Sequence, residues 1–254
     1  MKKRFGVIGA FLVASTLIIH MIRQARENNV KIHKWTRSGY PPHVPPLSLF
    51  FISDVHKRKI SNDLLSSIND KCDLVIIGGD FTEPGVPKLR TEENLAKLIQ
   101  LGPVLFVNGN NDDEVDQDWL HQLLDSPQVY NLNDRAFTLK QGNKTIRFLG
   151  LAQRYYSQEQ IDRLFAEDCA DFTVVICHYP DVSRFLNGKE INMMLSGHTH
   201  GGQIRLGRFG LRSHGGVTKE EGYDKLVSNG YGTTRVSLRL GAKPETHWIT
   251  LSSE

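Results

Sequence analysis

Five apolar runs in this chain are each followed by side chains of the types that bind metal ions. The runs are LSLFFI (47–52), LVII (74–77), VLFV (104–107), FTVVIC (172–177) and INMMLS (191–196), and a sixth, IRFLGL, covers 146–151. Short runs that are apolar throughout are typical of strands buried on both faces. Stretches of helical spacing alternate with them, at 62–68, 92–101, 119–124 and 158–165. The pattern predicts an α/β fold with a central sheet covered on both sides.

The polar side chains that follow these runs should meet in space. In an α/β sheet, the carboxyl ends of the strands border one crevice, and ligands bind there. Asp54 and His56 are two residues apart, so an extended chain turns both side chains to one face, and His198 and His200 repeat this spacing. We therefore expect a single site at the strand ends.

The set of candidate ligands predicts two metal ions. Seven side chains follow the runs with suitable chemistry: Asp54, His56, Asp80, Asn110, His178, His198 and His200. Carboxylate, imidazole and amide donors together suit Mn, Fe, Zn or Mg, and seven donors are too many for one ion. One Asp-x-His or Gly-Gly-Asp alone would be an ordinary turn. Together they indicate a site with two divalent ions, of the kind that binds a phosphoryl group and acidifies a water molecule.

The order of these motifs resembles the calcineurin-like metallophosphoesterases. The chain carries Asp-x-His at 54–56, Gly-Gly-Asp at 78–80, Gly-Asn at 109–110, a strand-end His178 and GHTHGGQ at 197–203. The strings GHTHGGQIRL, VSNGYGTT, LRLGAKPE and WITL are similar to the bacterial membrane-associated phosphodiesterase branch of that family. The resemblance extends over residues 28–254 and implies a four-layer α-β-β-α sandwich with a two-metal site at the strand ends.

The resemblance also implies a role for each candidate ligand. It assigns the first metal to Asp54, His56 and His200 and the second to Asn110, His178 and His198, with Asp80 as the bridge. A hydroxide between the metals would then attack phosphorus in line. The implied activity is hydrolysis of a phosphodiester or pyrophosphate bond in a phosphoester substrate that is nucleotide- or lipid-linked.

The chain departs from the family pattern at one catalytic position. Members usually carry His after the Gly-Asn pair as the general acid, whereas this chain has Asn111 followed by Asp112. Asn111 and Asp112 are therefore the catalytic candidates, although an amide cannot give a proton to a leaving group. The alternative is a metal-binding scaffold with weak or no turnover. The complete set of seven ligands favours the enzyme, because a decaying site usually loses ligands too.

The N-terminal segment predicts a membrane anchor. Residues 5–22 carry no charged side chain, and as a helix they would measure roughly 27 Å, close to the hydrocarbon thickness of a bilayer. A cleaved signal peptide fits less well, because the apolar run continues past the small residues at 13–15. The expected organisation is an anchor at 1–27, a short strand and Pro-rich linker at 28–46, and a metallophosphoesterase domain at 47–254.

Charge and cysteine content bear on partners and location. Residues 1–46 hold eight Lys/Arg and one acid, whereas the remainder holds 23 Lys/Arg and 27 Asp/Glu. The basic arm predicts membrane lipid as a partner, and the acidic body argues against nucleic acid. The three cysteines form no Cys-x-x-Cys motif, which argues against a disulfide framework. Together with the distribution of Lys/Arg around the span, this favours the cytoplasmic face of the membrane for the body.

Overall fold

The apolar runs form the inner strands of two six-stranded sheets in the computed structural model, which describes residues 2–36, 40–68, 71–166 and 170–253. The first sheet has the order β1 (Val30–Thr36), β14 (Thr246–Ser252), β2 (Leu47–Ile52), β3 (Leu74–Gly78), β4 (Val104–Val107) and β5 (Val129–Asn131). The second has the order β12 (Gly216–Lys219), β13 (Asp224–Val227), β9 (Met193–Ser196), β8 (Phe172–Cys177), β7 (Lys144–Leu151) and β6 (Ala136–Gln141). A small ribbon pairs β10 (Arg205–Leu206) with β11 (Phe209–Gly210).

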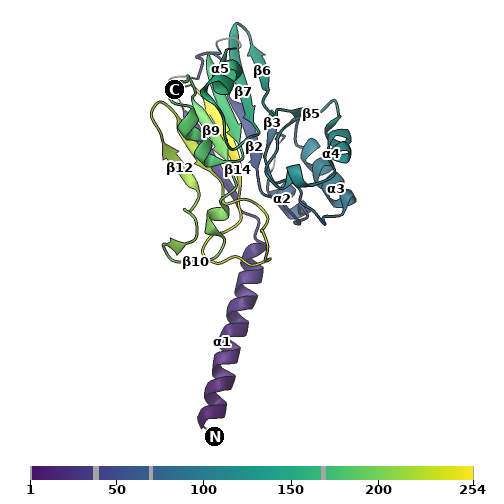
Figure 1. The fold of residues 1–254 in the computed structure, drawn as a ribbon, viewed down its shortest axis with the longest axis vertical. Coiled ribbons are helices and arrows are strands. Elements are labelled where there is room, and N and C mark those ends of the chain that lie inside the picture. Colours follow the sequence, from purple (N-terminus) through teal and green to yellow (C-terminus); the bar gives the residue numbers. More distant parts are fainter. Residues whose placement is uncertain (1, 37–39, 69–70, 167–169, 254) are drawn as a thin grey trace.

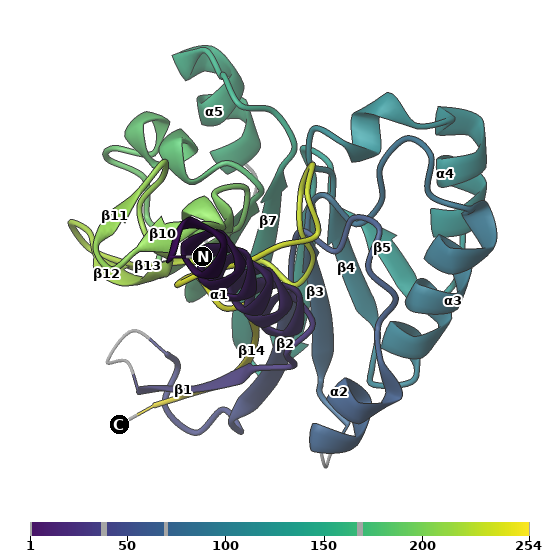
Figure 2. The same cartoon turned by 90° about the horizontal axis from the view of Figure 1, so that it is seen from below.

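All the helices except the first lie on the outer faces of the two sheets (Figures 1 and 2). The helices are α1 (Lys2–Ala25), α2 (Asn62–Ser67), α3 (Lys88–Ile99), α4 (Gln117–Leu124) and α5 (Gln158–Phe165), with short 3₁₀ turns η1 (Asp112–Glu114), η2 (Pro180–Phe185) and η3 (His200–Gly202). Apolar residues of α2, α3 and α4 pack on the first sheet. Those of α5 and η2 pack on the second.

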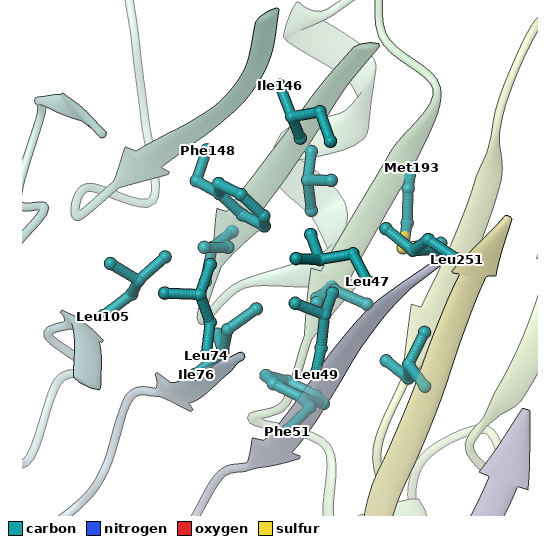
Figure 3. Packing of buried hydrophobic residues seen from close by; sticks show 14 of the residues in the cluster. Leu47, Leu49, Phe51, Leu74, Ile76, Leu105, Ile146, Phe148, Met193 and Leu251 are labelled. Atoms are coloured by element: carbon teal, nitrogen blue, oxygen red, sulfur yellow. The ribbon is translucent and has the colours of Figure 1, made fainter. Parts of the chain in front are cut away.

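The main core lies between the two sheets (Figure 3). Leu49 and Phe51 of β2 belong to it together with Phe148 of β7, while Phe50 and Ile52 belong to the cluster on the opposite side, under the helices. This alternation makes the whole run apolar. The prediction of a mixed α/β fold is confirmed, but the pattern suggested one central sheet where the structure has two. A strand is apolar on both faces whether a helix or a second sheet covers it, so the pattern cannot tell these cases apart.

Three parallel strands in each sheet bring the polar segments to one edge. Strands β2, β3 and β4 run parallel in the first sheet, and β7, β8 and β9 run parallel in the second. The backbone of Asp54 donates to the carbonyl of Gly79, and that of Gly197 donates to the carbonyl of His178. These bonds join neighbouring strand ends within each sheet, so the loops after the strands are held side by side.

The structure contradicts the prediction of a transmembrane anchor. Helix α1 forms and extends away from the sheets (Figure 1). However, no helix in the described part of the chain combines the length and the apolar character needed to cross a bilayer. The end of the expected span instead belongs to the folded domain: Met21 and Ala25 are buried, and the carbonyl of Met21 accepts a hydrogen bond from the backbone of Arg239. The predictions of a transmembrane helix at 5–22, of a membrane location and of a cytoplasmic-side body are therefore wrong.

The segment after α1 contributes to the first sheet. The short strand expected there is β1, which pairs in parallel with β14 along its whole length. Tyr40 and Val44, beyond β1, are buried in the core between the sheets. The division at residues 27 and 46 stays a prediction.

Candidate metal centre

The loops that follow β2 and β9 bring together the first group of candidate ligands. Asp54, His56 and His200 are all buried and offer ligand atoms within 4.8 Å of one another. The Nε2 atoms of His56 and His200 are 3.1 Å apart, and Nε2 of His200 is 3.3 Å from Oδ1 of Asp54. Three donors at such separations surround a point that a single cation could occupy.

The second group comes from the ends of β3, β8 and β9. Asp80, His178 and His198 offer ligand atoms within 4.8 Å of one another. Nε2 of His178 is 3.3 Å from Oδ2 of Asp80 and 3.2 Å from Nδ1 of His198. The same Oδ2 lies 3.7 Å from Nε2 of His56, which belongs to the first group. Asp80 thus lies between the two groups, at the position of the predicted bridge.

Burial and the neighbouring charges perturb the histidines strongly. Burial opposes ionisation of both His178 and Asp80, yet the Asp80 carboxylate raises the pKa of His178 to about 9. In turn, His178 holds the pKa of Asp80 far below its usual range. Burial lowers the pKa of His200 to about 3, and the nearby Arg239 adds to that effect. A metal cation binds to ionised carboxylates and neutral imidazoles. The ionised Asp80 carboxylate and the neutral His200 imidazole therefore match its needs.

Hydrogen bonds at the far nitrogens orient two of the rings. Nδ1 of His56 lies 2.7 Å from Oε2 of Glu83, and Nδ1 of His178 lies 2.9 Å from the carbonyl oxygen of Gly78. Each acceptor fixes the proton on Nδ1 and leaves Nε2 free to bind a metal. Glu83 follows Asp80 by three residues, and no periodicity or motif in the sequence had indicated it.

The backbone at this site is held in an unusual conformation. Five of the candidate ligands have positive φ values: Asp54 (54°), His56 (52°), Asp80 (51°), His198 (71°) and His200 (49°). Such a conformation costs a non-glycine residue about 1 kcal/mol or more, and it persists where the surroundings impose it for function. Gly109 contributes to these surroundings, because a Cβ there would lie 2.3 Å from Oδ1 of Asp80.

Asn110 provides an independent test of whether these residues suit a metal. Its Oδ1 is closed to solvent and has no hydrogen-bond partner among the described residues. It lies between Gly109 and Asn111, which both approach Asp80. A buried amide oxygen without a partner is costly unless something binds it. Together with imidazole and carboxylate donors, it fits divalent cations.

The side chains of the two catalytic candidates, Asn111 and Asp112, are both already engaged in hydrogen bonds. Asn111 donates from its backbone to Oδ1 of Asp80 (2.8 Å) and from its side chain to Oδ2 (2.7 Å). Asp112 is fully buried, and its two oxygens accept hydrogen bonds from the backbones of Thr82 and Gly109. Burial, with repulsion from Asp80, raises the pKa of Asp112 to about 7. The catalytic roles of both residues stay predictions. In the structure, Asp112 links the backbones of the loops after β3 and β4 through its two hydrogen bonds.

Arg239 is a component that the sequence did not reveal. It is the largest fully buried side chain of the described chain. Its guanidinium donates to the backbone carbonyls of Asn229, Gly232 and Ala242, and its Nη2 lies 3.3 Å from Nδ1 of His200. These acceptors all lie in the long segment between β13 and β14, so Arg239 holds that segment folded behind one candidate ligand. No local pattern shows this, because the acceptors are backbone atoms, whose positions depend on how the segment folds.

Comparison with known proteins agrees with this geometry. A family model of calcineurin-like phosphoesterases matches residues 47–202. The chain is 40% identical to the Bacillus subtilis protein called "Uncharacterized protein YpbG", over 99% of this chain and 98% of that one. It is 24% identical to "Phosphodiesterase YaeI" of Escherichia coli, over 84% of each chain.

Solved structures share the fold at low sequence identity. The Haemophilus influenzae NAD nucleotidase NadN aligns with a TM-score of 0.54 at 13% identity, over 74% of this chain and 46% of that one. A putative 5'-nucleotidase from Staphylococcus aureus aligns with a TM-score of 0.52 at 11% identity, over 83% of this chain and 55% of that one. This chain thus spans about half the length of these two proteins. On the family match and the full-length relative, the chain belongs to the calcineurin-like phosphoesterases.

Proposed function

We propose that this protein hydrolyses a phosphodiester or pyrophosphate bond and that it uses two divalent metal ions. The observation that carries the proposal is the pair of ligand groups that meet at Oδ2 of Asp80. Bound there, two cations would polarise the phosphoryl group and acidify a water molecule. The phosphodiesterase relative supports the choice of bond.

The residues of the site would hold the two ions and orient the imidazole ligands. Asp54, His56 and His200 would hold one ion, and Asn110, His178 and His198 the other, with Asp80 contacting both. Glu83 and the carbonyl of Gly78 keep the imidazoles of His56 and His178 in the tautomer that exposes Nε2. The partly exposed side chains of Asn110, Asn111 and His198 mark where the site meets solvent.

The residue at the position of the general acid restricts the leaving group. The Asn111 amide already donates to Asp80 and carries no acidic proton. Hydrolysis would then depend on leaving groups that depart as stable anions, such as a nucleotide phosphate in a pyrophosphate or an aryl oxide. We infer that alkyl diesters are poor substrates.

The direct test measures metal content and hydrolysis on the same preparations. Wild-type protein should contain two ions and should hydrolyse bis-p-nitrophenyl phosphate and a dinucleoside pyrophosphate. Asp80→Asn removes the shared carboxylate, so we expect loss of bound metal and a fall in kcat/KM of at least about a hundredfold. Asp63→Asn, on the exposed side of α2, is the matched control. Full activity in metal-free Asp80→Asn protein would contradict the proposal.

Asn111 also allows a second candidate function, that of a metal-binding protein with little or no catalytic activity. A protein that binds two metals but turns over slowly or not at all would also place a non-acidic side chain beside Asp80. Two bound metals without measurable hydrolysis of either substrate would select this candidate.

A further inference from the structure

A row of aromatic and cationic side chains leads from the metal centre out to the surface of the second sheet's loops, from the buried Tyr179 to the exposed Tyr155. The ring of Tyr179 contacts the rings of His178 and His198, with centroids 5.2 and 5.0 Å apart. The guanidinium carbon of Arg154 lies 5.7 Å from the Tyr179 centroid, on the loop between β7 and α5. Arg154 is therefore one side chain removed from two candidate ligands.

The next member of the row is an exposed ring with two cations close to it. Tyr155 is 64% exposed. The guanidinium carbons of Arg154 and Arg184 lie 5.8 and 5.4 Å from its centroid. An open aromatic face is a surface on which a planar ring stacks, and flanking guanidinium groups attract the phosphate that such a ring carries.

Hydrogen bonds to the buried Tyr156 and to Asp134 hold the loop that carries Arg154 and Tyr155 in place. The hydroxyl of the buried Tyr156 donates to Oδ1 of Asp134 and accepts from the backbone of Gln153. Gln153 also donates to Asp134 through its side chain (2.8 Å). The residues on either side of the pair, Gln153 and Tyr156, are thus bound to one carboxylate, while Tyr155 is exposed and Arg154 half-exposed. Preorganisation of this kind lowers the entropy cost of binding a ligand.

Arg154 can exchange its present partner for a phosphate. Its Nε and Nη2 atoms both lie 3.3 Å from Oδ2 of Asp181, and the two side chains are 38% and 39% exposed. A pair this exposed contributes little stability, so a doubly charged phosphate competes for it readily.

We propose that Arg154, Tyr155 and Arg184 form a subsite for a nucleoside phosphate, in which the base stacks on Tyr155 and the arginines bind the phosphate. The subsite would hold the part of the substrate that extends beyond the bond that is cut, so the inference rests on the function proposed above. A simple phosphate monoester would occupy the metal centre and have no group for Tyr155. The substrate class is therefore a nucleotide-linked phosphoester.

Equilibrium binding tests this without turnover. Metal-loaded protein is titrated calorimetrically with adenosine monophosphate, inorganic phosphate and adenosine. The nucleotide should bind about tenfold tighter than phosphate or adenosine alone, because it makes both contacts. Tyr155→Ser should remove this advantage, and Tyr155→Phe should keep it because the ring remains. Arg154→Gln should weaken nucleotide binding about tenfold.

The controls separate the subsite from its surroundings. Arg163→Gln changes an exposed arginine of α5 that pairs only loosely with Glu159, at 3.7 Å, and it should bind the nucleotide as the wild type does. Equal affinities for nucleotide and phosphate, or unchanged binding in both Tyr155→Ser and Arg154→Gln, would overturn the proposal. If the nucleotide binds as expected but nothing is hydrolysed, the subsite stands and the proposed activity fails.

Discussion

Among single residues, Asn111 has the clearest expected effect on turnover. Replacing it with the usual residue of the family, Asn111→His, supplies a proton donor, and general acid catalysis is worth about 10²–10⁴-fold where the leaving oxygen is basic. We expect kcat/KM to rise more for an alkyl phosphodiester than for an aryl one. Asn111→Ala, which removes the hydrogen bond to Asp80 without adding an acid, should not change this ratio. An unchanged ratio in Asn111→His would mean that this residue does not occupy the acid's position.

Glu83 is a second residue whose contribution can be isolated. Its Oε2 contacts Nδ1 of His56 at 2.7 Å, and an anionic acceptor at that nitrogen increases the basicity of the other. Glu83→Gln keeps the shape but removes the charge, so metal affinity should fall by about 10–100-fold. Competition with a chelating dye measures this. Glu93→Gln alters a carboxylate paired with Lys59 and is the matched control, and equal affinity in both variants would show that Glu83 does not tune the metal.

Residue by residue, the sequence indicated the candidate ligands but not the residues that support them. Each candidate ligand follows an apolar run, so the strand that buries the run also places the candidate ligand. Glu83 and Arg239 lie in loops without periodicity, and their partners are distant in sequence. Which way the Asn111 amide points depends on the backbone of the same turn. Such contacts follow from the tertiary arrangement and not from local pattern.

At the level of elements, the pairing of β1 with β14 places a half-buried histidine, His33, beside a buried one, His247. Nε2 of His33 lies 3.0 Å from Nδ1 of His247, which is buried and also contacts Ser228. Burial, with repulsion from His33, lowers the pKa of His247 to about 3. In the unfolded chain this histidine has an ordinary pKa near 6.5. The folded state therefore resists a proton that the unfolded state accepts.

Because the folded state binds this proton more weakly than the unfolded state, the stability of the fold should fall as the pH falls. The contribution of His247 is complete above about pH 6.5 and is lost as the pH falls toward the folded value, at up to about 1.4 kcal/mol per pH unit. His247→Gln should flatten the acid limb of stability, as measured by urea unfolding from about pH 7.5 to about pH 4.5. His121→Gln, on the exposed side of α4, is the control. Parallel curves for wild type and His247→Gln would contradict the assignment.

Element boundaries were predicted well where one period dominated. Strands β4 and β8 and helix α5 coincide with the predicted ranges. Helix α3 begins four residues earlier than expected, at Lys88, because the only apolar residue of its first turn is Leu89, which is exposed and does not belong to the buried face. The edge strands β5, β6 and β12 were not specified, since strands at a sheet edge are short or polar and have no continuous apolar run.

On the scale of the whole molecule, the end of α1 should matter more than its beginning. Residues 9, 11–14 and 16–20 are exposed, whereas Met21, Gln24 and Ala25 are buried. A chain that begins at residue 20 should keep the wild-type Tm. A chain that begins at residue 27 loses the Met21 contact and should be destabilised by about 2 kcal/mol, which lowers Tm by about 4–8 °C. Calorimetry measures both, and identical Tm values would show that the docking contributes nothing.

The position of β14 has a consequence for how the protein is made. This last strand pairs with β1 on one side and with β2 on the other, so residues 246–252 fill a gap between two strands near the start of the chain. During synthesis, β1 therefore has no neighbour in its sheet until residues 246–252 have left the ribosome. A message that stops before codon 246 would yield a chain whose first sheet is split, with β1 and β2 both left with unpaired edges that can aggregate.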